Sequence, residues 1–142
     1  MCLVPVLGLA HAVADVLPAP SGHVARVTGA AYVSSRGYTN AAKVGQAIVP
    51  GVSLSTGEGG ELGVIFSDGS VLSFGPHSEL TLDDYRFAPA ADELRLNARL
   101  RRGTLSLLTG DIARLAPGAV ALDTPEGRVR VHGGHILMRV AE

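Results

Sequence analysis

The sequence has little cysteine, few aromatic residues and almost no net charge. Its single cysteine, Cys2, excludes an intrachain disulfide, so the fold must be stabilised by an apolar core. Aromatic residues make up 4% and tryptophan is absent, which leaves few stacking platforms for bases or sugars. The 12 Lys and Arg residues balance 13 Asp and Glu residues. We therefore expect no nucleic-acid partner, because such binding needs a strongly basic surface.

The chain of 142 residues is instead rich in apolar residues and turn formers. Hydrophobic residues make up 46%, which excludes a disordered protein. The length leaves room for one compact domain. The 18 glycines and 8 prolines are scattered, a composition typical of many short elements joined by tight turns.

The first residues predict an export signal. Residues 1–12 (MCLVPVLGLAHA) are mostly apolar and end in an Ala-x-Ala pattern, as signal peptides do. Pro5 and Gly8 argue against the alternative, a buried strand. Residues 13–22 are predicted to form an extended linker, and the domain is predicted to span residues 23–142. No other apolar run approaches the ~20 residues that span a bilayer. We expect a periplasmic or secreted protein with no transmembrane segment after signal removal.

Alternating apolar residues predict a single all-β domain of many short strands. The strongest signal is a hairpin in which Asp68-Gly69 joins Glu61–Ser67 to Ser70–Phe74. Glycine or proline recurs every few residues between the strands, which favours a sandwich or a rolled, solenoid-like β structure. The other predicted strands are Val24–Thr28, Ala31–Ser35, Ala47–Val49, Ser53–Thr56, Glu79–Asp83, Thr104–Leu108, Ala119–Asp123, Gly127–His132 and residues 136–140.

Two segments leave the choice between helix and strand open. Asp92–Arg102 fits a helix that begins at Asp92, but four apolar residues match the strand period better. Asp111–Leu115 is predicted to form one helical turn, which Pro117 ends.

The order of several short motifs resembles that of the FecR-like domain, named after the regulator of ferric citrate transport in Gram-negative bacteria. The resemblance covers about residues 22–140, and its most diagnostic motif runs from Phe66 through Asp68 and Gly69 to Ser70. It continues through Arg102–Leu105, Thr109–Ala113 and Thr124-Pro125. The family's C-terminal motif is degenerate here: Val131 and Gly133 match, whereas His132 stands where arginine is usual.

The resemblance implies an exported, non-enzymatic β module that contacts another envelope protein. In the best-known members this domain relays a signal from an outer-membrane receptor to a cytoplasmic sigma factor. Without a predicted transmembrane helix, that relay is not carried over. We therefore expect a protein-interaction or envelope-associated module linked to signalling. The alternative is an extracytoplasmic module that binds a cell-wall glycan or a small anion.

The residues themselves predict no catalytic site, cofactor or metal centre. His132 and His135 flank two glycines, but a metal site needs three or four ligands, so they are interpreted as turn-flanking residues and as candidates for contact with a partner. Asp83 and Asp84 are adjacent on a strand, so their carboxylates should point to opposite faces. The one basic cluster is an anion-binding or partner-binding patch, or else a solvated face, and consists of Arg99, Arg101 and Arg102.

Overall fold

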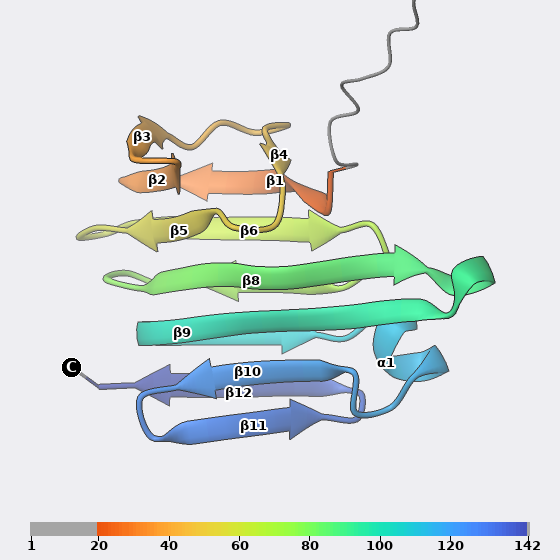
Figure 1. Ribbon diagram of the computed structural model, residues 1–142. Helices are drawn as coiled ribbons and strands as arrows, with labels where there is room; N and C mark the ends of the chain where they lie inside the picture. Colours follow the sequence, from red (N-terminus) through yellow and green to blue (C-terminus); the bar gives the residue numbers. More distant parts are fainter. Residues whose placement is uncertain (1–19, 142) are drawn as a thin grey trace, which may run out of the picture.

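The computed structural model describes residues 20–141 (Figure 1). The predicted signal peptide and most of the predicted linker lie outside the described residues. The last two linker residues belong to the fold: Ser21 is buried, its N–H donates to the Ile48 carbonyl (2.7 Å), and Gly22 begins the first strand. In the described part, no helix has the length and apolar character required to cross a membrane.

The all-β prediction is confirmed, because the described chain forms one 12-stranded sheet that doubles back into two layers (Figure 1). Layer A contains, in spatial order, β4 (Ala47–Ile48), β1 (Gly22–Thr28), β6 (Glu61–Phe66), β7 (Val71–Phe74), the second half of β9 (Glu93–Leu108) and β12 (His135–Val140). Layer B contains β3 (Tyr38–Ala41), β2 (Ala31–Ser35), β5 (Ser53–Thr56), β8 (Glu79–Ala88), the first half of β9, β10 (Val120–Thr124) and β11 (Gly127–Val131). Neighbouring strands are antiparallel except β9 and β10, which are parallel.

The chain crosses repeatedly between the layers at one side of the molecule, the left in Figure 1, through glycine-rich turns. Successive crossings are hydrogen-bonded to one another. The Gly57 N–H donates to the Ala30 carbonyl (2.9 Å), and the Ser78 N–H donates to Thr56 Oγ1 (2.9 Å). The Thr104 N–H donates to Ser78 Oγ (3.0 Å). This stack of crossings corresponds to the rolled, solenoid-like arrangement that the sequence left open.

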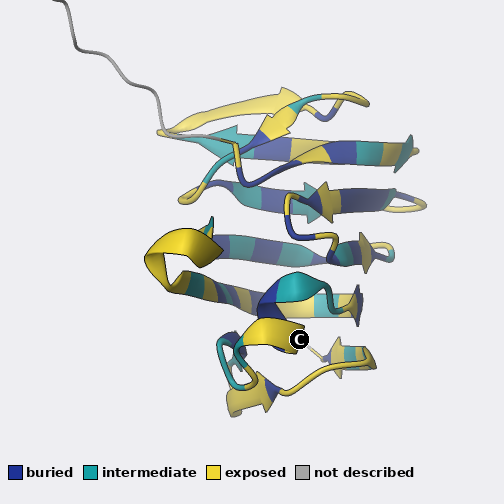
Figure 2. Cartoon of the chain, turned by 90° about the vertical axis from the view of Figure 1, so that its right-hand side faces the viewer, coloured by how far each residue is buried: buried dark blue, intermediate teal, exposed yellow. Residues whose placement is uncertain are grey.

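The hydrophobic core lies between the two layers. Figure 2 shows buried residues alternating with exposed ones along the strands, as the period-2 pattern requires. Leucines from both layers fill the core, among them Leu54, Leu80, Leu72 and Leu107. On the side opposite the crossings, the helix α1 (Asp111–Leu115) inserts Ile112 and Ala113, both buried.

The predicted hairpin and helical turn are present, and the segment left open between helix and strand forms a strand from Glu93 onward. Three features differ from the prediction. Strand β3 was not expected, because all four of its residues are exposed and carry no apolar alternation. Strand β8 runs on to Ala88 and is joined to β9 by the 3-10 turn η1 (Pro89–Ala91). The sequence predicts separate elements at residues 92–102 and 104–108, but both lie in the continuous strand β9, which passes from layer B to layer A at Gly103.

Candidate functional site

The motif from Phe66 to Ser70 forms the tight turn of the β6–β7 hairpin. The Ser70 N–H donates to Asp68 Oδ1 (3.3 Å), so the side chain closes the turn two residues on. The Gly69 N–H donates to the Phe66 carbonyl (3.0 Å), and Gly69 has φ +90°, which favours glycine. These bonds explain locally why the chain reverses at Asp68-Gly69.

The same turn holds the start of α1. Three successive N–H groups, those of residues 110, 111 and 112, donate into it. They reach Ser70 Oγ (3.0 Å), the Asp68 carbonyl (2.9 Å) and Asp68 Oδ2 (3.0 Å) respectively. Because the first N–H groups of a helix have no partner within it, Asp68 and Ser70 supply the missing acceptors. The motif therefore joins a hairpin to a helix more than 40 residues later in the chain.

Tyr85 completes this cluster from strand β8. Its hydroxyl donates to Asp68 Oδ1 (2.8 Å) and accepts from the Asp68 N–H (3.0 Å), and its ring stacks on Phe66 with centroids 5.2 Å apart. Burial, together with the hydrogen bond to the Asp68 carboxylate, raises the pKa of the Tyr85 hydroxyl above its ordinary value. Ionisation here would place a second negative charge beside a buried carboxylate, so we interpret the cluster as structural.

The raised pKa of Tyr85 predicts a loss of stability in alkali. Above about pH 10 the unfolded chain releases the tyrosine proton, whereas the folded chain keeps it. The unfolded state then binds fewer protons, so the free energy of unfolding falls as pH rises, by up to about 1.4 kcal/mol per pH unit. Below about pH 10, Tyr85 does not make the free energy of unfolding depend on pH. Urea unfolding on both sides of this pH would measure the effect, and Tyr85→Phe should lose that part of the slope.

The C-terminal motif residues also occupy turns and the core. Thr124 Oγ1 accepts from the Glu126 N–H (3.1 Å) and donates to the Gly127 carbonyl (3.0 Å), which closes the β10–β11 turn around Pro125. Val131 is buried, and Gly133 has φ +144° in the crossing from β11 to β12. These residues shape the last two strands and do not converge on a site.

The predicted basic cluster lies on the outer face of layer B, where carboxylates already pair with it. Arg99 Nη2 lies 2.6 Å from Asp83 Oδ1, and this bond raises the pKa of the Arg99 guanidinium. Arg101 and Arg102 both approach the Glu79 carboxylate, at 3.3 and 3.6 Å. The three guanidiniums therefore belong to a surface network of ion pairs and not to an open anion site.

The expectation that Asp83 and Asp84 point to opposite faces is wrong. A bulge between Leu82 and Asp84 adds one residue to strand β8, so both carboxylates lie on the outer face while Leu82 and Tyr85 point inward. Asp84 Oδ2 lies 2.6 Å from Arg95 Nη1, just as Asp83 pairs with Arg99. Each aspartate has an arginine partner, and the two do not form a shared acidic site.

The two histidines beside the glycine pair are exposed and play separate roles. His135 Nε2 lies 2.7 Å from Ser106 Oγ on the outer face of layer A. His132 lies in the crossing from β11 to β12. Within residues 20–141 no three His, Cys, Asp or Glu side chains are grouped closely enough to hold a metal ion.

The outer face of layer A differs from that of layer B, and it is the candidate interaction face. One row of paired positions crosses four strands through Ile65, Val71, Leu108 and His135. Ile65 and Leu108 are 37% and 49% exposed, although both are large apolar residues. The next row contains Gly63, Ser73, Ser106 and Leu137, the last of them 74% exposed.

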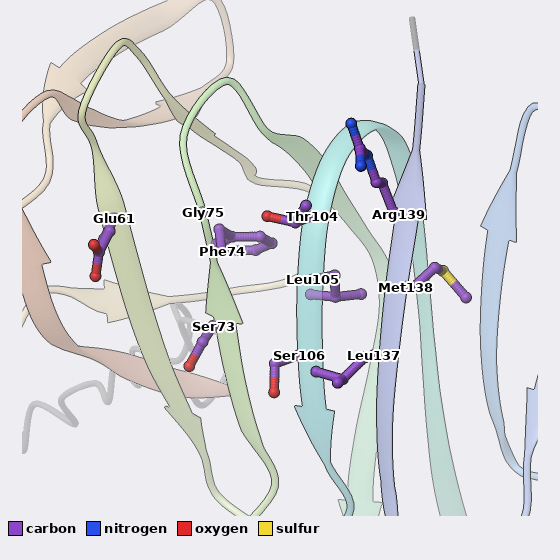
Figure 3. A pocket seen from close by; sticks show the side chains of 10 residues that line it. All are labelled: Glu61, Ser73, Phe74, Gly75, Thr104, Leu105, Ser106, Leu137, Met138 and Arg139. Carbon is purple, nitrogen blue, oxygen red and sulfur yellow. The ribbon is translucent and has the colours of Figure 1, made fainter.

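A shallow groove of about 440 Å³ lies along this face (Figure 3). Ser73, Ser106 and Leu137 lie side by side on β7, β9 and β12, while Glu61 and Arg139 stand on opposite sides of the groove. Small side chains in the middle and a protruding leucine at the end make the surface concave. Sequence reasoning missed this face, although apolar residues at outward positions of alternating strands were its signal.

Comparison with known proteins identifies the chain. A family model described as FecR protein matches residues 52–142, more than half of the sequence. The chain belongs to the FecR family. The match begins at Val52 and contains the Asp68 turn, α1 and most of both outer faces. No curated protein and no solved structure matches the chain.

FecR membership identifies a signalling-related regulatory domain of a non-enzymatic family. Domains of this family are typically extracytoplasmic in bacteria and take part in signalling protein interactions. In this chain the diagnostic FecR motif builds the hairpin–helix joint, whereas the exposed apolar face lies on other residues of the matched region.

Proposed function

We propose that this FecR domain is an extracytoplasmic, non-catalytic module that binds another protein of the bacterial cell envelope through the outer face of layer A. One observation carries the proposal: the two outer faces of the same sheet differ in character. Among the described residues, the outer face of layer B carries a row of ion pairs with Tyr32 as its exposed large apolar residue, whereas layer A exposes Ile65, Leu108 and Leu137 beside a groove. Exposed apolar surface next to small residues is typical of a protein-binding site.

The outer face of layer B supports the choice between the two faces. Arg128 Nε and Nη2 donate to the two oxygens of Asp123 (2.7 and 3.1 Å), and this pair lowers the pKa of the Asp123 carboxyl. With Arg99 and Arg95 also paired, a ligand would have to displace existing ion pairs. On this face, this disfavours the alternative function, binding of a cell-wall glycan or a small anion through the arginine cluster, because such a ligand needs free guanidiniums.

Substitution on the two faces tests the proposal. A photo-crosslinking residue at position 137 should form an adduct with a single envelope protein in living cells. The same residue at position 32 should form none, since Tyr32 is an exposed apolar residue on the outer face of layer B. Leu137→Glu, tested with the crosslinker at Leu108, should reduce the adduct at least tenfold. Because Leu137 is exposed, we expect Leu137→Glu to change the free energy of unfolding of the protein by less than about 0.5 kcal/mol.

Equal adducts from both faces, or adducts unaffected by Leu137→Glu, would contradict this assignment of the binding face. Location needs its own experiment. Residues 1–22, fused ahead of a reporter that is active only after export, should yield an active reporter. Cytoplasmic retention of that fusion would remove the envelope part of the proposal and leave the binding face untouched.

A further inference from the structure

The two ends of the stacked sheet are finished differently. At the N-terminal end, the segment between β3 and β4 folds over strands β2 and β1 (Figure 1). The Gly45 N–H donates to the Val24 carbonyl (2.7 Å), and the Ala42 N–H donates to the Ala31 carbonyl (2.9 Å). Ala42 and Ile48 are buried there, so this end is covered by the chain itself.

At the C-terminal end the strands β11 and β12 are edges. Within the described residues, β11 pairs only with β10, and β12 pairs only with β9. Their core-side residues are less buried than their neighbours in the sheet. Leu107 and Leu105 on β9 are fully or almost fully buried, whereas their partners Ile136 and Met138 on β12 are only half-buried. In the described part of the chain, no strand covers this end of the core.

These edges are also basic. Neither β11 (GRVRV) nor β12 (HILMRV) contains an acidic residue. Arg128 is paired with Asp123, and Arg130 Nη1 donates to the Gly118 carbonyl (3.1 Å). Arg139 makes no ion pair with any residue that the structure describes. A strand added to β12 would place its outward side chains beside His135, Leu137 and Arg139, and its inward side chains against Ile136 and Met138.

We propose that the β12 edge binds an extended segment of a partner protein that places apolar residues against Ile136 and Met138 and an acidic residue beside Arg139. Main-chain hydrogen bonds to an edge strand supply affinity, and the alternate side chains supply specificity. The inference rests on the proposed function and names its partner's chemistry, because Leu137 and Arg139 belong both to this edge and to the groove of layer A.

A second copy of this chain that pairs through β11 fits less well. Two β11 strands that pair antiparallel over most of their length, with Val129 and Val131 kept on the core side, place arginine opposite arginine. Like charges directly opposite one another destabilise a strand pair. At β12, an acidic residue of an added strand instead meets the Arg139 guanidinium, which has no ion-pair partner among the described residues.

Short capped peptides test the proposal on the full chain. One alternates glutamate with valine, a second has lysine in place of glutamate, and a third is the glutamate peptide with alternate N-methylated amides. At low ionic strength the glutamate peptide should protect the amides of residues 135–140 from hydrogen exchange. We expect it to bind at least about tenfold more tightly than either control peptide, and added salt should weaken it.

Charge reversal at the edge provides the matched variants. Arg139→Glu should weaken the glutamate peptide about tenfold or more and strengthen the lysine peptide. Arg36→Glu, an exposed arginine in the β2–β3 turn at the covered end, should leave both affinities unchanged.

Three outcomes would overturn strand addition at β12. They are no binding of the glutamate peptide, equal binding of its N-methylated form, and concentration-dependent dimers without peptide. Protection centred on Ile65 and Leu108 with none at β12 would also overturn it, but that result would leave the proposed function standing.

Discussion

Asp68→Ala is expected to lower the free energy of unfolding by about 3–5 kcal/mol, because it removes the acceptor of a buried network. Asp68 is only 3% exposed, and its carboxylate accepts hydrogen bonds from Ser70, Tyr85 and Ile112. Alanine would leave two donors in the core, the Tyr85 O–H and the Ile112 N–H, without the carboxylate oxygens that accept from them. Urea unfolding, followed by circular dichroism, would measure the loss as a lower midpoint.

Asp111→Ala is the matched control, because Asp111 lies at the start of the same helix but its side chain is 48% exposed and, among the described residues, forms an ion pair with Arg114. An exposed pair of this kind contributes at most about 1 kcal/mol. Asp68→Asn separates the effect of shape from that of charge, because it keeps the side-chain volume but places an amide N–H where the network needs an acceptor. We expect it to lower the free energy of unfolding by an amount between those of the two alanine variants. If Asp68→Ala and Asp111→Ala had equal effects, the joint would not contribute the stability that its geometry indicates.

The role of Asp68 also separates the residues that build the fold from the residues that we propose bind a partner. Its carboxylate is buried and fully hydrogen-bonded, so it has nothing to offer a partner. A loss of partner binding in an Asp68 variant would therefore follow from loosening α1 and the β6–β7 hairpin. The exposed face of Ile65, Leu108 and Leu137 is where a substitution can affect binding without unfolding the protein.

The sequence predicts the strands of this fold better than their arrangement. Period-2 alternation locates Ala31–Ser35 and Ser53–Thr56 to the residue, and Asp-Gly identifies the hairpin, because both signals are local. The layer to which each strand belongs depends on pairing between distant residues, such as Leu54 with Leu80, which local periodicity does not encode.

The candidate site shows the same limit. Arg99, Arg101 and Arg102 stand out in the sequence as a cluster, but their partners Asp83 and Glu79 come from the preceding strand, and a bulge decides which way Asp83 points. The apolar face of layer A joins residues from four strands, each unremarkable alone. A surface assembled from single outward residues becomes visible only when the register of the strands is known.

Gly103→Ala is expected to destabilise the protein by about 3–5 kcal/mol, the sum of a strained backbone and a steric overlap. Gly103 has φ +101°, a conformation that L side chains rarely adopt, at the point where β9 passes between the layers. A Cβ added there would overlap the backbone Cα and the side chain of Ser78 in the neighbouring crossing. That crossing holds the Thr104 N–H and cannot move without breaking the bond to Ser78 Oγ.

Gly45→Ala isolates the backbone part of this cost. Gly45 has a similar φ of +90°, but no atom lies within 4 Å of an added Cβ, so we expect a loss of only about 1–2 kcal/mol. The difference between the two variants measures the close approach of successive crossings. Ser78→Gly should recover part of the Gly103→Ala loss by removing the overlapping side chain, although the double variant also lacks the Ser78 hydrogen bonds. Equal losses for Gly103→Ala and Gly45→Ala would mean that successive crossings are not tightly packed, and would contradict the interpretation that their packing stabilises the rolled sheet.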